Sequence, residues 1–201
     1  MAFSTYSEFQ TLIANYAARD DLTSQIVDFI TFAENRMSRD LRTSPMLSTA
    51  SLTITNNSAT LPTDLLEMRS IYIDTNPVTY LEYQTPDQFY KNGYINLAGP
   101  CFYYSIIDNE FKFAPNPSSQ DANILYYARP TILSVLNATN IYLASYPDAL
   151  LYATMAELET YLMNDDRVTH WAGLYDRAIN NIKTSDLGTK YPNTALNVTP
   201  H

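Results

Sequence analysis

The chain has 201 residues, of which 46% are hydrophobic and 16% are charged, so it has the composition of a folded globular protein with fewer charges than usual. Its formal net charge of −9 disfavours tight binding to nucleic acid, because an acidic surface repels phosphate. No run approaches the roughly 18 apolar residues of a membrane span, and the first residues lack a signal-peptide pattern, so neither export nor a membrane anchor is expected.

Residues 1–45 predict a pair of helices. Thr5 and Glu8 have the spacing of a capping box, and apolar residues then recur at helical spacing. The second helix is expected to end before Pro45, because the residue before a proline avoids helical geometry. Its apolar stripe consists of Leu22, Ile26, Phe29, Ile30, Ala33, Met37 and Leu41.

Residues 46–131 consist of short β-type runs separated by turn residues, which is typical of strands joined by hairpins. Asp108 and Asn109 suit a tight hairpin turn. Thr85 and Pro86 predict the start of a short helix over residues 85–92. The expected strands are residues 51–55, 67–74, 78–83, 101–107, 110–114 and 123–128.

Residues 132–187 return to helical spacing and predict a second pair of helices that completes a bundle with the first. Ser145 and Asp148 form another candidate capping pair, and Leu187-Gly188 is the expected helix end. Residues 188–201 are polar and lack periodicity, so an extended C-terminal tail is expected. The predicted fold class is α+β: a bundle of N- and C-terminal helices with an inserted antiparallel β-sheet region.

Candidate metal ligands are few. His170 lies four residues after Asp166, so both share one helix face and could supply half of a metal site. No further His or Cys completes the ligand set. The alternative is that Asp166 caps the helix while His170 packs beside Trp171. We predict no metal and no cofactor.

Candidate catalytic groups are equally sparse. Glu157 and Glu159 diverge on a helix, although a glycosidase needs two facing carboxylates. The single Cys101 is expected to be a small core residue. We therefore predict no catalytic residue and no enzymatic activity.

Three arginines, Arg36, Arg39 and Arg42, form a partial stripe at the C-terminal end of the second helix, where positive charge is favourable. They form either a solvated or salt-bridged face or a surface that pairs with acidic residues of a neighbouring subunit.

Tyrosine is the most informative residue type, with 17 copies. Neighbouring side chains in a strand point to opposite faces, so Tyr103-Tyr104 and Tyr126-Tyr127 each place one ring on either side. The second face must be covered by the chain's own helix or loop or by another molecule, and tyrosine is enriched in interfaces.

The sequence resembles the head-to-tail adaptors, also called connectors or tail accessory factors, of short-tailed bacteriophages. The similar segments, in chain order, are DLTSQIVDFITFAENRMSRDLR, ATLPTDLLEMRSIYID, GPCFYYSIIDNEFKFAPNP, ILYYARP and TNIYLASYPDALLYATMAELETYLMNDDRV. The resemblance implies a structural virion protein of the neck, made in the host bacterial cytoplasm. It implies a ring of about twelve copies beneath the portal that extends the DNA channel and attaches the tail nozzle.

The resemblance also implies partners. They are other copies of the chain, the portal, the tail nozzle and tail fibre or spike proteins, with DNA only as passing cargo. The tail is expected to dock on the portal through Tyr191, Leu196 and Val198, and the β region to contact a neighbour or the next tail protein.

Two other function classes remain open from the sequence. One is a virion-associated cell-wall glycan hydrolase that uses Glu157 or Asp166 as its acid. The other is a monomeric module that binds carbohydrate or peptide on its aromatic sheet.

Overall fold

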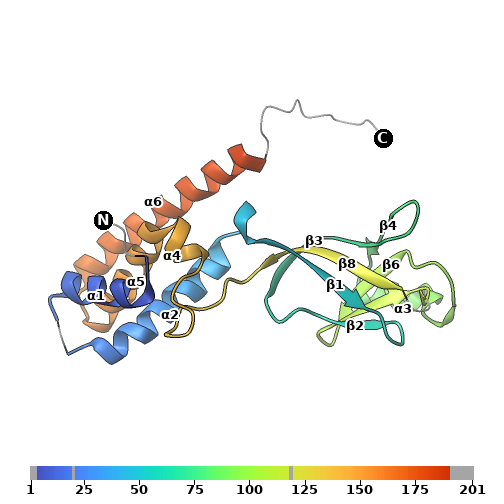
Figure 1. Ribbon diagram of the computed structural model, residues 1–201, viewed down its shortest axis with the longest axis horizontal. Coiled ribbons are helices and arrows are strands. Elements are labelled where there is room, and N and C mark those ends of the chain that lie inside the picture. The colour runs from blue at the N-terminus through green and yellow to red at the C-terminus, as the bar shows by residue number, and fades with distance from the viewer. Residues whose placement is uncertain (1–3, 20, 118–119, 191–201) are drawn as a thin grey trace. The chain divides into compact units, whose positions relative to one another are not determined.

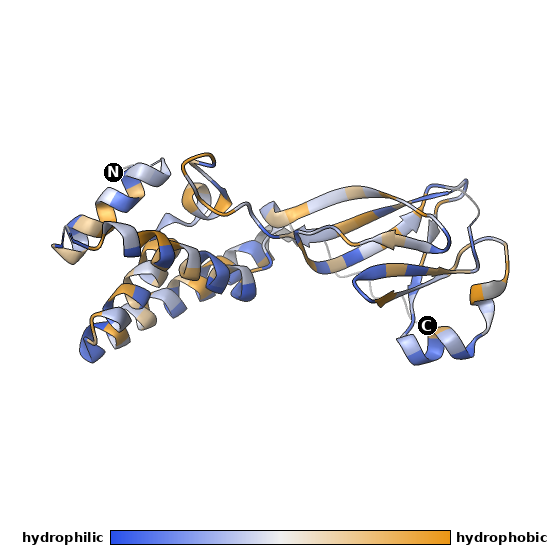
Figure 2. Ribbon diagram, turned by 90° about the horizontal axis from the view of Figure 1, so that it is seen from below, coloured by the Kyte–Doolittle hydropathy of each residue, from blue (hydrophilic) through white to orange (hydrophobic). Residues whose placement is uncertain are grey.

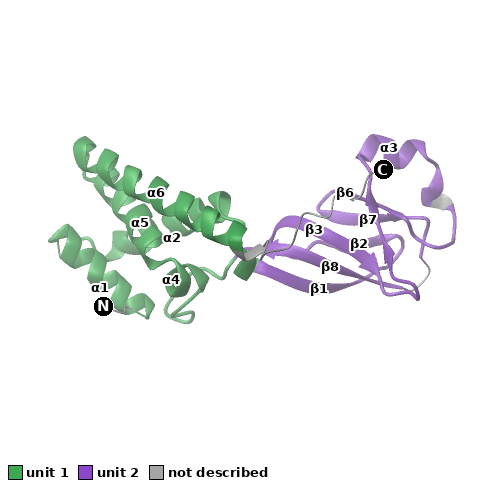
Figure 3. Ribbon diagram, turned by 90° about the horizontal axis from the view of Figure 1, so that it is seen from above, with its two compact units in different colours: residues 1–46, 130–201 green, residues 47–129 purple. Residues whose placement is uncertain are grey.

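A computed structural model describes residues 4–19, 21–117 and 120–190. The chain forms two compact units, shown in two colours in Figure 3. Residues 1–46 and 130–201 belong to the first, which we call the helical unit, and residues 47–129 form the second, the β unit. The β unit is thus inserted between the two parts of the helical unit, and the α+β class is confirmed.

The helical unit contains helices from both ends of the chain (Figure 1). The pairings of α2 with α5 and of α5 with α6 are its most extensive helix contacts. Its elements are α1 (Tyr6–Ala17), α2 (Thr23–Asp40), the 3-10 turn η1 (Ser44–Met46), α4 (Ile141–Ser145), α5 (Pro147–Tyr161) and α6 (Asp165–Lys190).

The start of α1 follows directly from its sequence. The Thr5 hydroxyl accepts a hydrogen bond from the Glu8 amide, and the Glu8 carboxylate accepts one from the Thr5 amide. These two bonds satisfy backbone donors that a helix start leaves free. The predicted capping box is therefore confirmed.

Burial explains how the helices are arranged. The predicted stripe of α2, from Leu22 to Leu41, is buried along its whole length. In contrast, α5 has buried residues on nearly every side, as expected of a helix surrounded by others. We conclude that α5 is the central helix of the unit.

One predicted helix start and one predicted helix end are wrong. Ser145 is the last residue of α4 and does not cap α5, which begins after Tyr146. Instead the Asn140 side chain accepts a hydrogen bond from the Leu143 amide and starts α4, a helix too short to show periodicity. Residue 188 is also not the start of a tail, because α6 continues through Gly188 to Lys190.

The reason for the longer α6 is tertiary. Glycine lowers helix stability but does not forbid helical geometry. The Asp186 carboxylate accepts a hydrogen bond of 2.6 Å from the Ser44 amide, so the last turns of α6 are tied to η1. This contact is not readable from the spacing of residues along α6.

The β unit contains two four-stranded sheets where one sheet region was predicted. The first has the order β1-β8-β3-β4 and the second the order β2-β7-β6-β5. The strands are β1 (Leu47–Thr53), β2 (Ser58–Thr60), β3 (Leu65–Ile73), β4 (Thr79–Tyr80), β5 (Glu82–Tyr83), β6 (Tyr103–Ile107), β7 (Glu110–Ala114) and β8 (Asp121–Ala128), with the short α3 (Pro86–Lys91) and η2 (Tyr94–Asn96) between β5 and β6.

One core joins the two sheets. Ile71 and Ile124 from the first sheet and Phe111 and Phe113 from the second belong to the same buried cluster. The strand predicted for residues 110–114 is confirmed, and its side chains alternate, since Phe111 and Phe113 are fully buried and Lys112 is not. The β unit is thus a pair of sheets with a shared apolar interior.

Strand details differ from the prediction in several regions. β1 covers Leu47–Thr53 where residues 51–55 were expected, and β2 was not expected. Residues 78–83 form two short strands, because the chain passes from the first sheet to the second at the buried Leu81. The pairing of β5 with β6 is parallel, so the region is mixed and not purely antiparallel. The hairpin turn is confirmed, because Asp108 and Asn109 both have positive φ between β6 and β7.

The start of α3 is only partly as predicted. Pro86 occupies the first helical position and Thr85 precedes it, but the Thr85 side chain accepts no capping hydrogen bond from the helix. The fixed φ of proline favours a helix start without that bond.

Candidate interaction surfaces

His170 is exposed on α6, and the centroid of its ring lies 5.7 Å from that of the Trp171 ring. Asp166 lies in the first turn of α6, where a carboxylate meets the positive helix end. Within residues 4–19, 21–117 and 120–190, His, Cys, Asp and Glu nowhere gather in a group of three that could hold a metal ion.

The carboxylates of α5 have a structural arrangement. Glu159 is fully buried, and its Oε1 lies 3.0 Å from Nε of Arg167 at the start of α6. The Asn164 side chain donates to the other oxygen, at 3.3 Å. A buried carboxylate needs such partners, so Glu159 links α5 to α6. Glu157, two residues earlier on α5, is half-buried.

The three arginines of the predicted stripe differ in their contacts and exposure. Arg36 lies over the Tyr175 ring, 4.2 Å from its centroid, and 4.0 Å from Asp176 of α6. Arg42 donates to backbone carbonyl oxygens at the end of α2. Only Arg39 of the three is exposed. The structure does not bring the three guanidinium groups into one exposed site.

Polar contacts reinforce the same helices. The Tyr175 hydroxyl donates a hydrogen bond of 2.6 Å to Asp40 at the end of α2. Burial, together with this carboxylate, raises the pKa of Tyr175, so its phenol stays protonated. These contacts fix α6 against α2.

The tyrosines of β8 are covered by the chain itself. Tyr126 belongs to the core between the sheets, and its hydroxyl donates to Asp64 at 3.1 Å. Tyr127 is also buried, and the Arg69 guanidinium lies 6.0 Å from its ring centroid. In this unit both faces of β8 are therefore occupied, and neither ring is an exposed interface residue.

The tyrosines of β6 lie at a more open place. Tyr103 stacks on Tyr94 at 5.8 Å between ring centroids, and Tyr104 meets Tyr83 edge-on at 5.5 Å. Both β6 tyrosines are half-buried, whereas Tyr83, Tyr94 and Phe102 are exposed. We call these five residues the aromatic edge.

The aromatic edge lies where the second sheet ends. β5 is its outermost strand and has only two residues, both exposed. An edge strand leaves backbone groups free for pairing, and exposed aromatic rings add apolar contact area. Sequence reasoning found Tyr103 and Tyr104 but missed Tyr83, Tyr94 and Phe102. The available signal was the density of aromatic residues between 80 and 104.

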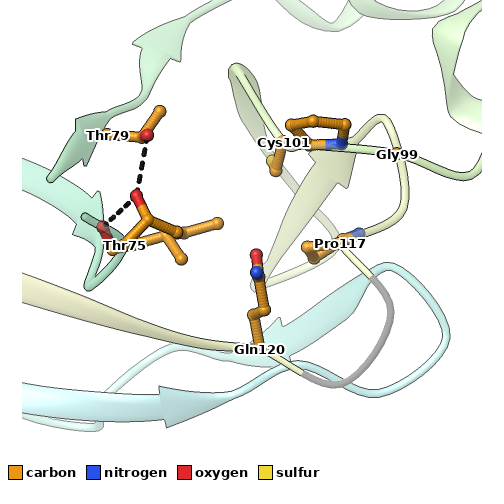
Figure 4. A pocket seen from close by; sticks show the side chains of 8 residues that line it. Thr75, Thr79, Gly99, Cys101, Pro117 and Gln120 are labelled. Carbon is orange, nitrogen blue, oxygen red and sulfur yellow. Dashed lines mark hydrogen bonds between the residues drawn. The ribbon is translucent and has the colours of Figure 1, made fainter. Parts of the chain in front are cut away.

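The β unit contains a cavity of about 260 Å³ (Figure 4). Thr75 and Thr79 share a hydrogen bond of 2.9 Å on one side, and Cys101 and Pro117 lie on the other. Burial raises the pKa of the Cys101 thiol to about 11, so it is not a nucleophile near neutral pH. The prediction that Cys101 is a core residue is confirmed.

The remaining predicted contact residues, Tyr191, Leu196 and Val198, lie outside the described residues. None of the described helices is long and apolar enough to cross a membrane.

The chain matches the family of SU10 adaptor proteins over residues 4–197 and belongs to that family. It is therefore a phage adaptor with a structural role. No curated protein matches the sequence.

Proposed function

We propose that the chain is the head-to-tail adaptor of the virion and forms a closed ring of about twelve copies beneath the portal. The ring extends the DNA channel and attaches the tail nozzle. The observation that carries this proposal is the family match over residues 4–197, which includes both units of the fold.

Charge supports the role in the channel. The chain has a formal net charge of −9, and an acidic surface repels the DNA backbone. DNA then passes without being held, which a conduit requires.

Three groups of residues have roles in this assembly. The aromatic edge contacts the nozzle or another tail protein, since exposed aromatic residues are typical anchors of interfaces. Arg39 pairs with an acidic residue of a neighbouring copy. Residues Tyr191, Leu196 and Val198 dock on the portal.

Mass photometry of the full chain with and without its cognate portal ring tests the proposal. A discrete complex that contains several copies per portal ring is the expected result. A chain that stays monomeric and does not bind the portal ring would refute the adaptor role. The monomeric binding module would then be the better description.

The aromatic edge needs a separate test. Tyr83→Ser combined with Tyr94→Ser should leave portal binding intact but weaken attachment of the nozzle. Phe32→Ser, an exposed aromatic position on α2, is the matched control. Equal nozzle attachment in both variants would remove the edge from the proposal.

A further inference from the structure

An apolar loop projects from the helical unit between β8 and α4. We call residues 131–139 the apolar loop; it contains no charged residue. Its gold-coloured trace is visible beside α4 in Figure 1, and Figure 2 shows its hydrophobic colouring. At its tip, Val135 and Leu136 are 90% and 100% exposed. Two adjacent apolar side chains so fully exposed to water are unfavourable unless something covers them.

The tip is held in shape by hydrogen bonds. The amides of Ser134 and Asn137 each donate to the other residue's carbonyl oxygen, at 3.0 and 3.1 Å. The Asn137 side chain donates back to the carbonyl oxygens of Thr131 and Ile132. The exposed pair therefore stands on a closed turn and is presented in a defined geometry.

The base of the loop is anchored in the helical unit. Leu133 is buried, and its amide donates to both carboxylate oxygens of Glu34 on α2, at 3.2 Å each. The Asn140 side chain donates to Glu34 and to the carbonyl oxygen of Thr131. The amide of Tyr6 donates to the carbonyl oxygen of Ala138, at 2.7 Å. Helices α1 and α2 thus both hold the loop. Because the loop is already ordered, its docking on a partner costs little conformational entropy.

A cavity in the same unit has an apolar wall. Its volume is about 390 Å³; Pro45, Tyr146 and Ile182 form the apolar part of its lining, and Ser44, Asn181, Ser185 and Asp186 line the rest. The Asp186 carboxylate already accepts a hydrogen bond from the Ser44 amide. An engineered apolar cavity of about 150 Å³ admits benzene, so this one has room for a valine and a leucine side chain.

We infer that Val135 and Leu136 of one copy insert into the cavity beside Pro45 and Ile182 of the next copy. The loop and the cavity are made by different elements of one unit, so the contact is heterologous. Repetition of a heterologous contact produces a ring when its rotation closes. The inference rests on the proposed ring and names the residues that hold neighbouring copies together.

The size of the contact explains when it forms. Two side chains bury far less than the roughly 800 Å² per partner of a standard stable interface. The contact is therefore too small to hold two free copies together and becomes effective when a portal ring places copies side by side.

Cysteine crosslinking tests the contact directly. Chains with Leu136→Cys are mixed with chains with Asn181→Cys, which lies at the cavity, and assembled on the cognate portal ring under mild oxidation. A disulfide-linked dimer that contains one chain of each kind is expected. Phe32→Cys mixed with Asn181→Cys is the control and should give no dimer. The native Cys101 is buried and does not compete.

A second measurement uses the double change Val135→Ser and Leu136→Ser. Both side chains are exposed, so folding is retained, which circular dichroism checks. The variant should need a concentration at least about tenfold higher than the unchanged chain to occupy the portal ring to the same extent. Rings of normal affinity with no specific crosslink would overturn this inference but leave the adaptor role intact. Failure of the unchanged chain to assemble would overturn the adaptor role itself.

Discussion

Glu34 offers a sharp test of how the helical unit is stabilised. Its side chain is buried against Leu133 and Asn140, and burial raises the pKa of its carboxyl to about 7, although both hydrogen bonds act in the opposite direction. In the unfolded chain the carboxyl has its ordinary pKa of 4.5. Between these values the folded state binds more protons than the unfolded state.

The sign of the effect follows from linkage. The free energy of unfolding falls as the pH rises wherever the folded state holds the extra proton. One pKa unit corresponds to about 1.4 kcal/mol, so Glu34 lowers stability by about 3 kcal/mol across the full window. About 2 kcal/mol of this loss falls between pH 5 and pH 8.

The change Glu34→Gln removes the titrating group and keeps an oxygen that can accept from Leu133 and Asn140. The free energy of unfolding of each chain is measured in urea at pH 5 and at pH 8. From pH 5 to pH 8 it should fall by about 2 kcal/mol more in the unchanged chain than in the variant. Glu157→Gln, the same chemical change at a half-buried position of α5, is the control and should keep the pH dependence. An equal pH dependence in the unchanged chain and Glu34→Gln would refute the reasoning.

Three further outcomes are expected. Arg167→Ala removes the positive partner of the buried Glu159 carboxylate and should lower the free energy of unfolding, measured in urea, by about 2 kcal/mol; an unchanged value would contradict the role of Arg167 as that partner. Tyr175→Phe removes the hydrogen bond to Asp40 and should cost about 1 to 2 kcal/mol in the same assay, and a neutral result would contradict the role of that bond. Cys101 should not react with a thiol reagent at pH 8 until the chain is unfolded, because its pKa is about 11, and rapid labelling of the native chain would contradict its burial.

Much of the local structure was readable from the sequence. The capping box at Thr5, the apolar stripe of α2 and the turn at Asp108-Asn109 each depend on neighbours a few residues away. Such short-range patterns determine helix starts, helix faces and hairpins. The scarcity of histidine and cysteine in the sequence also favoured contact surfaces over a catalytic site.

Only the tertiary structure decided which aromatic residues are exposed. Tyr103 and Tyr126 lie in similar apolar runs, yet Tyr126 is in the core between two sheets and Tyr103 is at an open edge. Burial depends on the order of strands, and that order is set by pairings between residues far apart in the chain. The sequence pattern is the same for both positions.

The same reason applies to the apolar loop. The sequence predicts helical spacing from residue 132 onward and no exposed apolar loop there. The exposure of Leu136 and the burial of Leu133, three residues earlier, arise because Glu34 on α2 binds the Leu133 amide across 99 residues of sequence. Short-range patterns thus determined the elements, whereas long-range contacts decided which of their side chains are left for partners.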